Sequence, residues 1–346
     1  MTNRIVYTDP PWAIADGRVQ PGWDDLERSI LGPDVAVEVP RIVGGRFVDA
    51  TEDPDLVRGC RALVIYRQRV TDELLDLAGD DLAIVARQGV GTDNLAIDLL
   101  DRRGILGIHV PDYCVSEVAD HTTALLLALE RGVVGQSTAL AAGTFEIFGG
   151  GAPRRLADCT AAIIGFGRIG RAVASRLRTI YGRVLVVDPF QGAELAIGYG
   201  CVPVDVDTAL RDADVITLHC DLNERTAGMI SADALARMKP TTLLVNAARG
   251  GLVDPVALRD AVLAGTIGGA ALDVFVPEDP HDEPETWAEL LTHPNVIGTS
   301  HRAFLSEASE LASRRRIAEA IRDVLDLGVV PAVGVCTRPA EPVDVS

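Results

Sequence analysis

Short apolar, β-branched segments alternate with amphipathic segments along most of this chain. In the N-terminal part, strand-like segments occur at 4–9, 62–67 and 82–88, and helical periodicity occurs at 54–60 and 71–79. Single strands that alternate with helices are typical of an α/β domain built on a mostly parallel sheet. The pattern therefore predicts one α/β domain in this part of the chain.

A second alternating series begins where an apolar strand runs into a glycine-rich turn. Its apolar segments lie at 159–170, 183–188, 213–220, 241–248, 269–275 and 295–300. Between the two series, 117–140 shows an apolar helical pattern that predicts one long buried helix, and a further amphipathic helix is predicted at roughly 306–327. The simplest architecture has two domains, with the last helix returning to the first domain and a substrate cleft between them.

Composition and charge narrow the range of functions that this chain could have. The chain has 346 residues, enough for two domain cores. A net charge of −18 disfavours nucleic acid and anionic membranes as partners. No apolar run reaches the roughly 20 residues that span a bilayer, and the N-terminus lacks a signal-peptide pattern, so we expect a cytoplasmic protein. Six scattered cysteines without a C-x-x-C pair indicate reduced thiols and no metal site.

The glycine-rich turn of the second series matches G-x-G-x-x-G through Gly165, Gly167 and Gly170. An apolar strand precedes it, an amphipathic helix follows it, and the next strand ends at Asp188. This is the context of a dinucleotide fingerprint, in which glycines let the backbone approach a pyrophosphate and the acid binds a ribose. A carboxylate at this position repels a 2′-phosphate, so NAD is favoured over NADP. A glycine-rich turn without a ligand is the weaker alternative.

Three side chains suited to redox chemistry on a carbonyl follow consecutive strands of the second series. Arg249 follows 241–248, Glu278 follows the next strand, and His301 follows the last one. An arginine can hold a carboxylate with two hydrogen bonds, and a histidine oriented by a carboxylate can exchange a proton near neutral pH. Taken singly, Arg249 could pair with a helix end, Glu278 could be solvated and His301 could cap a strand. Their joint order favours a catalytic triad.

Several motifs together make the chain similar to the D-isomer-specific 2-hydroxyacid dehydrogenase family. The segments that carry the resemblance are "GVGTDN", "EVADHTTALLLAL", "IIGFGRIG", "VVDPF", "NAARGGLVD", "ALDVFVPEDP" and the His301 segment. The segments "VPDYCVSEVADH" and "HCDLNERT", together with Phe304 three residues after the histidine, look closest to the C-terminal-binding protein branch and its bacterial relatives. The resemblance implies an NAD-dependent dehydrogenase acting on a CH–OH group, with Arg249, Glu278 and His301 as catalytic residues.

The resemblance also implies residues that would contact NAD, mainly from the fingerprint and the ends of later strands. They are Thr122, Gly165, Gly167, Arg168, Ile169, Gly170, Asp188, Cys220, Thr226, Ala247, Ala248, Arg249, Asp273 and His301.

For the small anionic substrate, the predicted contacts are Val90, Gly91, Arg249 and Phe304, with Arg67 as a further candidate. The implied architecture is a Rossmann-type doubly wound NAD-binding domain at 109–302. A flavodoxin-like α/β substrate domain would be formed by 1–108 and 303–346. The family further implies a homodimer joined through the region around 112–155.

The chain departs from the family pattern near the site, and this leaves the substrate open. Ser300 stands where proline is common before the histidine, and Arg302 stands where a small or apolar residue is usual. Together with Arg67 and Arg69, Arg302 motivates an alternative substrate such as phosphite or a hydroxyphosphonate. The plainer interpretation pairs Arg302 with Glu307. A second alternative is a non-catalytic, NAD(H)-sensing corepressor-like protein.

Overall fold

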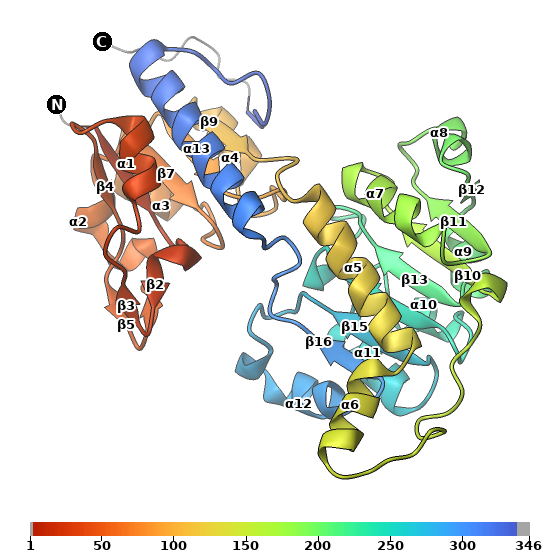
Figure 1. Cartoon of the computed structure of the whole chain (residues 1–346). Helices are drawn as coiled ribbons and strands as arrows, with labels where there is room; N and C mark the ends of the chain where they lie inside the picture. Colours follow the sequence, from red (N-terminus) through yellow and green to blue (C-terminus); the bar gives the residue numbers. More distant parts are fainter. Residues whose placement is uncertain (1–2, 338–346) are drawn as a thin grey trace. The chain divides into compact units, whose positions relative to one another are not determined.

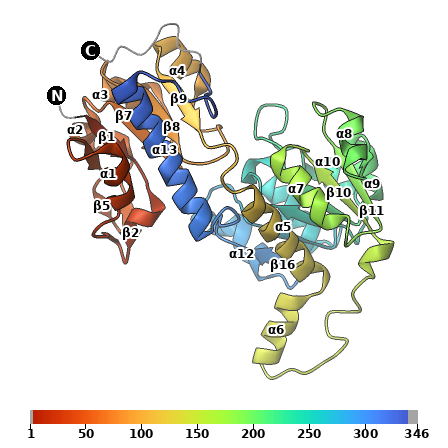
Figure 2. The ribbon, with the colours of Figure 1, turned by 45° about the horizontal axis from the view of Figure 1, so that its top comes forward.

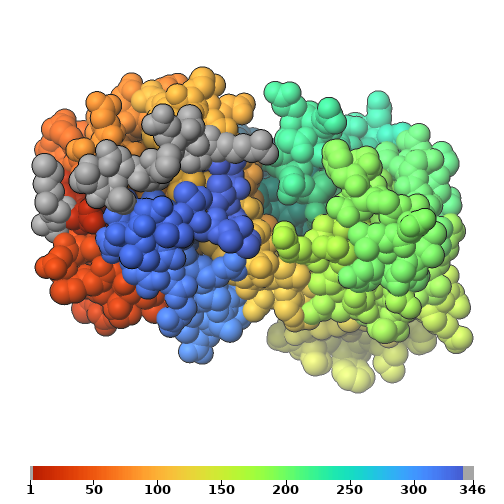
Figure 3. All heavy atoms as spheres, turned by 90° about the horizontal axis from the view of Figure 1, so that it is seen from above, coloured from red at the N-terminus to blue at the C-terminus, as the bar shows by residue number. Residues whose placement is uncertain are grey.

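The computed structural model describes residues 3–337, which divide into two compact units (Figure 1). The terminal unit combines the described residues up to Tyr113 with those from Ser306 onward, and the central unit spans Cys114–Leu305. In Figure 3, blue atoms from the end of the described chain lie against red and orange atoms of its first part. The division falls a few residues beyond the sequence-based boundaries at 108 and 302.

Five parallel strands form the main sheet of the terminal unit, in the order β4-β1-β7-β8-β9. The strands are β1 (Arg4–Tyr7), β4 (Ala36–Glu38), β7 (Ala62–Ile65), β8 (Ile84–Arg87) and β9 (Leu106–His109). Counted along the chain, this order is 2-1-3-4-5, the order of the flavodoxin-like folds. The predicted flavodoxin-like α/β architecture is therefore confirmed.

Alternating side chains of this sheet fill two cores. Ile5 and Tyr7 pack with the C-terminal helix on one face, whereas Val6 packs with apolar residues of the shorter helices on the other face. The helices are α1 (Asp25–Leu31), α2 (Pro54–Val57), α3 (Asp72–Ala78), α4 (Ile97–Arg103) and α13 (Glu307–Leu327). Figure 2 shows α13 alongside α1. The minor elements are η1 (Pro11–Ala13), η2 (Ala50–Glu52), β2 (Ile14–Ala15), β3 (Arg18–Val19), β5 (Ile42–Val43) and β6 (Arg46–Phe47).

Seven parallel strands form the sheet of the central unit, in the order β12-β11-β10-β13-β14-β15-β16. They are β10 (Thr160–Ile164), β11 (Arg183–Val187), β12 (Val202–Pro203), β13 (Val215–Leu218), β14 (Leu243–Asn246), β15 (Gly269–Leu272) and β16 (Val296–Gly298). Counted along the unit, the order 3-2-1-4-5-6-7 is that of a doubly wound Rossmann sheet with one added strand. The predicted Rossmann-type fold is confirmed.

Helices cover both faces of this sheet. Ala161 and Ile163 of β10 belong to a core with α5 and α7, and Ala162 and Ile164 belong to a core with helices on the opposite face. The helices are α5 (Val115–Glu130), α6 (Val133–Ala141), α7 (Arg168–Leu177), α8 (Ala193–Gly198), α9 (Val206–Asp212), α10 (Ala232–Ala236), α11 (Pro255–Leu263) and α12 (Pro284–Thr292). Short 3-10 turns are η3 (Leu156–Asp158), η4 (Gly250–Leu252) and η5 (Pro280–Asp282).

The prediction of one long buried helix over 117–140 is wrong for the second half of that segment. The chain forms two helices, because Gly132 takes a left-handed conformation (φ +61°) between α5 and α6. Leu125 and Leu126 of α5 are buried, whereas α6 buries none of its residues. The apolar pattern thus continues past the point where the helix leaves the core.

Within residues 3–337, no helix is both long and apolar enough to cross a membrane. In the same range, no group of three or more His, Cys, Asp or Glu side chains is placed to hold a metal ion.

Candidate active site

The glycine fingerprint lies at the point of the central sheet where the strand order reverses, between β10 and β13. Gly165 follows β10 with φ +97°, and a Cβ built there would lie 2.4 Å from the carbonyl carbon of His219. A Cβ on Gly170 would lie 2.1 Å from the carbonyl oxygen of Gly165. A Cβ on Gly167 would meet nothing within 4 Å. Packing therefore demands two of the glycines, and the third leaves an open cradle at the start of α7, where Arg168 and Ile169 begin the helix.

Asp188 follows the neighbouring strand β11 and organises the other side of this cradle. Its carboxylate accepts hydrogen bonds from the backbone N–H groups of Phe166 (2.7 Å), Phe190 (2.8 Å) and Gln191 (3.0 Å). Among residues 3–337, Oδ2 accepts a hydrogen bond from Phe166 alone, which leaves it a lone pair for a ribose hydroxyl.

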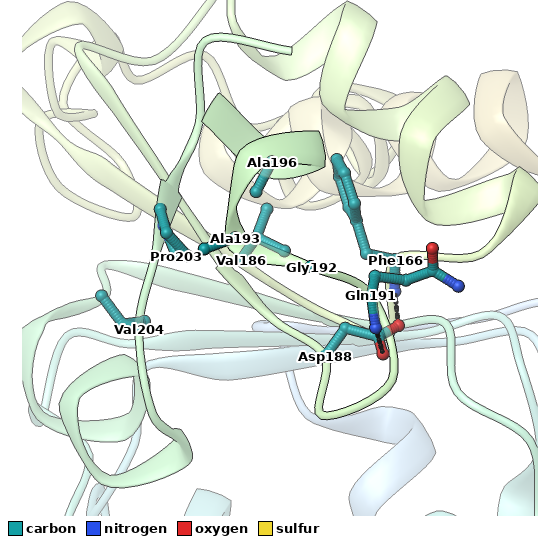
Figure 4. A pocket seen from close by; sticks show the side chains of 9 residues that line it. All are labelled: Phe166, Val186, Asp188, Gln191, Gly192, Ala193, Ala196, Pro203 and Val204. Carbon is teal, nitrogen blue, oxygen red and sulfur yellow. Dashed lines mark hydrogen bonds between the residues drawn. The ribbon is translucent and has the colours of Figure 1, made fainter. Parts of the chain in front are cut away.

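A cavity opens beside this carboxylate (Figure 4). It is lined by Phe166, Val186, Asp188, Gln191, Gly192, Ala193, Ala196, Pro203 and Val204. Its volume of about 110 Å³ is below the roughly 300–1,000 Å³ of sites that enclose a whole drug-sized ligand. It therefore suits one end of an extended ligand, with small apolar walls for a base and a carboxylate for a sugar. The open cradle and this cavity fit the pyrophosphate and the adenosine of NAD.

The terminal unit has a corresponding reversal of strand order between β1 and β7, and its own side chain fills it. Asp9 follows β1 and accepts hydrogen bonds from the backbone N–H groups of Tyr66 (2.8 Å), Arg67 (2.5 Å) and Gln68 (3.0 Å). Thr8 donates a fourth bond from Oγ1 at 2.7 Å. Without Asp9, these amides would form an anion-binding nest. The point of strand reversal is therefore filled by a side chain in the terminal unit, whereas it is open to a ligand in the central unit.

His301 and Glu278 form a close pair at the carboxyl end of the central sheet. His301 Nδ1 lies 2.5 Å from Glu278 Oε1, and the side chains are 22% and 40% exposed. The pair is therefore accessible at the surface. The backbone of His301 is left-handed (φ +48°), and its N–H donates to the carbonyl oxygen of Asp273 at 2.7 Å. The aromatic ring of Phe304 stands edge-on to the imidazole, with ring centroids 6.1 Å apart.

Asp273, at the end of β15, anchors this turn from within the core. Its side chain is fully buried and accepts bonds from Thr299 Oγ1 (2.6 Å) and from the amides of Arg302 (3.0 Å) and Ala303 (2.9 Å). His121 Nε2 lies 3.4 Å away. Burial raises the pKa of Asp273, but the hydrogen bonds from these groups outweigh it and hold the pKa below its ordinary value. Asp273 is therefore an ionised anchor.

Arg249 follows β14 in a loop that packs against the end of β15. Its Nη1 donates to the carbonyl oxygen of Ala248 at 2.7 Å, and Asn246 Nδ2 donates to the carbonyl oxygen of Arg249 at 2.8 Å. A Cβ on the next residue, Gly250, would lie 2.2 Å from the carbonyl oxygen of Phe275. The loop is thus held close to β15, and Arg249, Glu278 and His301 follow three adjacent strands of one sheet.

The loop after β13 carries Cys220 and Thr226. Thr226 Oγ1 donates to the carbonyl oxygen of Asp221 at 2.6 Å and closes the loop. Burial raises the pKa of the Cys220 thiol to about 11, so this cysteine is not a thiolate at neutral pH. Thr122 is fully buried on α5, and its hydroxyl has no hydrogen-bond partner within the described residues. The contacts of these residues with NAD stay predictions.

The predicted substrate residues outside the central unit lie at the carboxyl edge of the terminal sheet. Arg67 follows β7, and its guanidinium carbon lies 5.7 Å from the centre of the Tyr66 ring. Val90 and Gly91 follow β8, and the carbonyl oxygen of Val90 lies 2.7 Å from His109 Nδ1. Arg302, in the central unit, is exposed. The roles of these residues stay predictions.

No sequence motif singled out Asp9, His121 or Thr299, nor the buried His219. His219 follows β13 with Nε2 2.9 Å from Thr217 Oγ1, and burial lowers its pKa to about 3. His121 is 178 residues from its partner Thr299. Such residues meet because of the order of the strands in the sheet, and no local sequence motif indicates the contact.

The match to a protein family agrees with this geometry. The model of the NAD-binding domain of D-isomer specific 2-hydroxyacid dehydrogenases matches residues 123–303. The chain belongs to this family. The predicted family and the predicted NAD-binding domain are confirmed.

Curated relatives include the D-3-phosphoglycerate dehydrogenase of Synechocystis sp., 33% identical over 298 residues that cover 85% of this chain and 52% of that protein. The enzyme of the same name from Archaeoglobus fulgidus is 37% identical over 263 residues, 75% of this chain and 48% of that protein. The chain thus spans about half the length of the curated relatives it matches. The predicted nearness to the C-terminal-binding protein branch stays a prediction.

Among solved structures, the D-lactate dehydrogenase of Aquifex aeolicus, complexed with NAD and lactic acid, has a TM-score of 0.80 and 26% identity. The alignment covers 92% of this chain and 94% of that one. An acyclic imino acid reductase in complex with NADPH and D-Arg has a TM-score of 0.79 at 23% identity, which shows the shared fold alone.

Proposed function

We propose that this protein is an NAD(H)-dependent dehydrogenase that interconverts a small 2-hydroxy acid and its 2-oxo acid. The observation that carries the proposal is the 2.5 Å contact between His301 and Glu278, on the same sheet edge as Arg249. When bound, NADH supplies the hydride for the substrate carbon. The protein must then supply a proton and hold the substrate carboxylate, so that the proton donor faces the substrate carbonyl oxygen.

His301 is the proton donor in the direction of reduction. Because Nδ1 is engaged by Glu278, Nε2 is the ring nitrogen that gives its proton to the substrate carbonyl oxygen. The Glu278 carboxylate stabilises the imidazolium and fixes the ring orientation. Arg249 holds the substrate carboxylate through its guanidinium. In the direction of oxidation, neutral His301 takes the hydroxyl proton instead.

The test is a screen of NADH oxidation and NAD reduction against 2-oxo acids, 2-hydroxy acids, D-3-phosphoglycerate, phosphite and hydroxyphosphonates. His301→Ala should lower kcat by at least about 100-fold, the usual size of a lost general acid. Arg249→Ala should lower kcat/KM by about 10–100-fold through loss of charge-assisted hydrogen bonds. His281→Ala is the matched control, because the His281 side chain is exposed and pairs with Asp279. Full turnover in His301→Ala or Arg249→Ala would refute the assignment.

A substrate with a second anionic group is the alternative within this chemistry. The curated relatives named above are D-3-phosphoglycerate dehydrogenases, and Arg67 and Arg69 lie in the loop that Asp9 organises. Turnover of phosphite or a hydroxyphosphonate in place of every 2-oxo acid would favour the anion-oxidising alternative. NADH binding without any turnover would favour the non-catalytic corepressor-like alternative.

We also infer a homodimer joined through the region around 112–155. Within this region, α6 buries no residue, and Phe145, Ile147 and Phe148 are 83%, 81% and 80% exposed. Large apolar side chains gathered at a surface mark protein–protein contacts. Light scattering after gel filtration should give a dimer for the parent and for Val43→Asp, an exposed control. The double variant Phe145→Asp, Phe148→Asp should be a monomer, and a parent monomer would refute the inference.

A further inference from the structure

We propose that His121 is a positioning residue for the His301 turn, acting through Thr299 and Asp273. His121 lies on α5, and Thr299 and Asp273 follow β16 and β15. His121 Nε2 lies 3.1 Å from Thr299 Oγ1 and 3.4 Å from Asp273 Oδ1. The catalytic consequence of this role rests on the proposed dehydrogenase function, whereas the structural consequence does not.

Proton counting fixes the direction of these hydrogen bonds. Asp273 is ionised and can only accept, so the single hydroxyl proton of Thr299 goes to Asp273 Oδ1 at 2.6 Å. Thr299 Oγ1 must then accept from His121, and His121 Nε2 carries a proton. The three side chains form a directed chain from His121 through Thr299 to Asp273.

Asp273, the last member of this chain, binds the backbone at His301 and at the two residues that follow it. Asp273 accepts the amides of Arg302 and Ala303 through its carboxylate, and its carbonyl oxygen accepts the amide of His301. Left-handed backbone in a residue with a Cβ is costly and persists only where the surroundings fix it. Because Ser300 stands before His301, the turn gains no rigidity from a proline ring at that position. The network around Asp273 supplies the restraint.

His121 is suited to this task because its helix is itself fixed. α5 packs on α7, β14 and β15. Asp120, the residue before His121 on the same helix, forms an ion pair with Arg176 of α7 at 2.7 Å. The imidazole therefore projects from a rigid element and joins that element to a loop. Loss of its N–H group would remove the hydrogen bond that His121 donates to Thr299 beside Asp273, and would loosen the turn.

The experiment compares His121→Leu, which removes the donor, with His121→Gln, whose side-chain amide places an N–H group near the position of Nε2. Hydrogen–deuterium exchange of the peptide covering 298–305 is measured without cofactor. We expect exchange to be about fivefold faster in His121→Leu, the effect of one lost hydrogen bond, and unchanged in His121→Gln. Thr123→Ala is the matched control, because its hydroxyl donates locally to the carbonyl oxygen of Ala119 on the same helix.

Steady-state kinetics provide the second readout. His121→Leu should lower kcat about fivefold and leave the Kd for NADH unchanged, and His121→Gln should restore kcat. Thr299→Val should act like His121→Leu, and the double variant should show no further loss, because both substitutions break one chain. Unchanged exchange in both His121→Leu and Thr299→Val, or equal loss in His121→Gln, would overturn the role. A parent protein without turnover would refute the dehydrogenase function alone, since the exchange result stands independently.

Discussion

Gly165→Ala and Gly167→Ala separate the glycine that the fold needs from the glycine that the ligand needs. At Gly165 (φ +97°), the new Cβ would lie 2.4 Å from the carbonyl carbon of His219 and 2.5 Å from the amide nitrogen of Cys220. Both neighbours are backbone atoms next to β13, so neither can swing aside. Left-handed backbone costs about 1–2 kcal/mol for a residue with a Cβ, and overpacking adds about 1–3 kcal/mol.

Added together, these two costs lower the free energy of unfolding by about 2–5 kcal/mol in Gly165→Ala. For a unit the size of the central one, that corresponds to a fall in Tm of between about 4 and 20 °C. Gly167 has ordinary backbone (φ −68°) and open space around its Cβ position. Gly167→Ala should therefore keep the parent Tm but raise the Kd for NADH about tenfold or more, because its methyl group occupies the pyrophosphate cradle.

The assays are thermal unfolding without cofactor and fluorescence titration with NADH, run on the parent and both variants. The reasoning fails if Gly165→Ala melts at the parent temperature. It also fails if Gly167→Ala lowers Tm as much as Gly165→Ala does, or binds NADH as tightly as the parent.

Three more predictions concern charge. Burial lowers the pKa of His219 to about 3, below about 6.5 for the unfolded chain, so stability falls as pH drops from 6.5 toward 3. Urea unfolding at pH 7.5 and 5.5 should show the parent losing about 1 kcal/mol more than His219→Gln, and equal losses would contradict this. Glu278→Gln should lower kcat about tenfold by removing the charge that stabilises the imidazolium, whereas Glu285→Gln, an exposed neighbour, should not. Asp188→Ala should lower the preference for NADH over NADPH about tenfold in kcat/KM; an unchanged ratio would exclude Asp188 as the discriminating group.

Much of the central unit could be predicted because its signals are local. The strand before Gly165, the helix after it and the acid at the end of β11 lie within one short stretch of chain. Their order follows from the chemistry of binding a dinucleotide. The order of Arg249, Glu278 and His301 after successive strands was equally visible, since parallel strands bring their carboxyl ends to one edge.

The remaining features depend on contacts that no local pattern encodes. Asp9 meets amides 57 to 59 residues away, and that contact exists only because β1 and β7 are neighbours. The break between α5 and α6 had one local signal, Gly132, which the apolar pattern on both sides outweighed. Burial could not be predicted there, because apolar periodicity does not say whether a helix reaches a core.

His301 is one of three non-glycine residues with positive φ in the described chain, a conformation that costs about 1–3 kcal/mol. Glycine at this position would relieve that cost and remove the acid/base group at the same time. Selection for folding alone therefore favours glycine here, whereas selection for turnover favours the imidazole. A protein kept only as a nucleotide-binding scaffold would gain stability from glycine at this position and would lose nothing that its function needs.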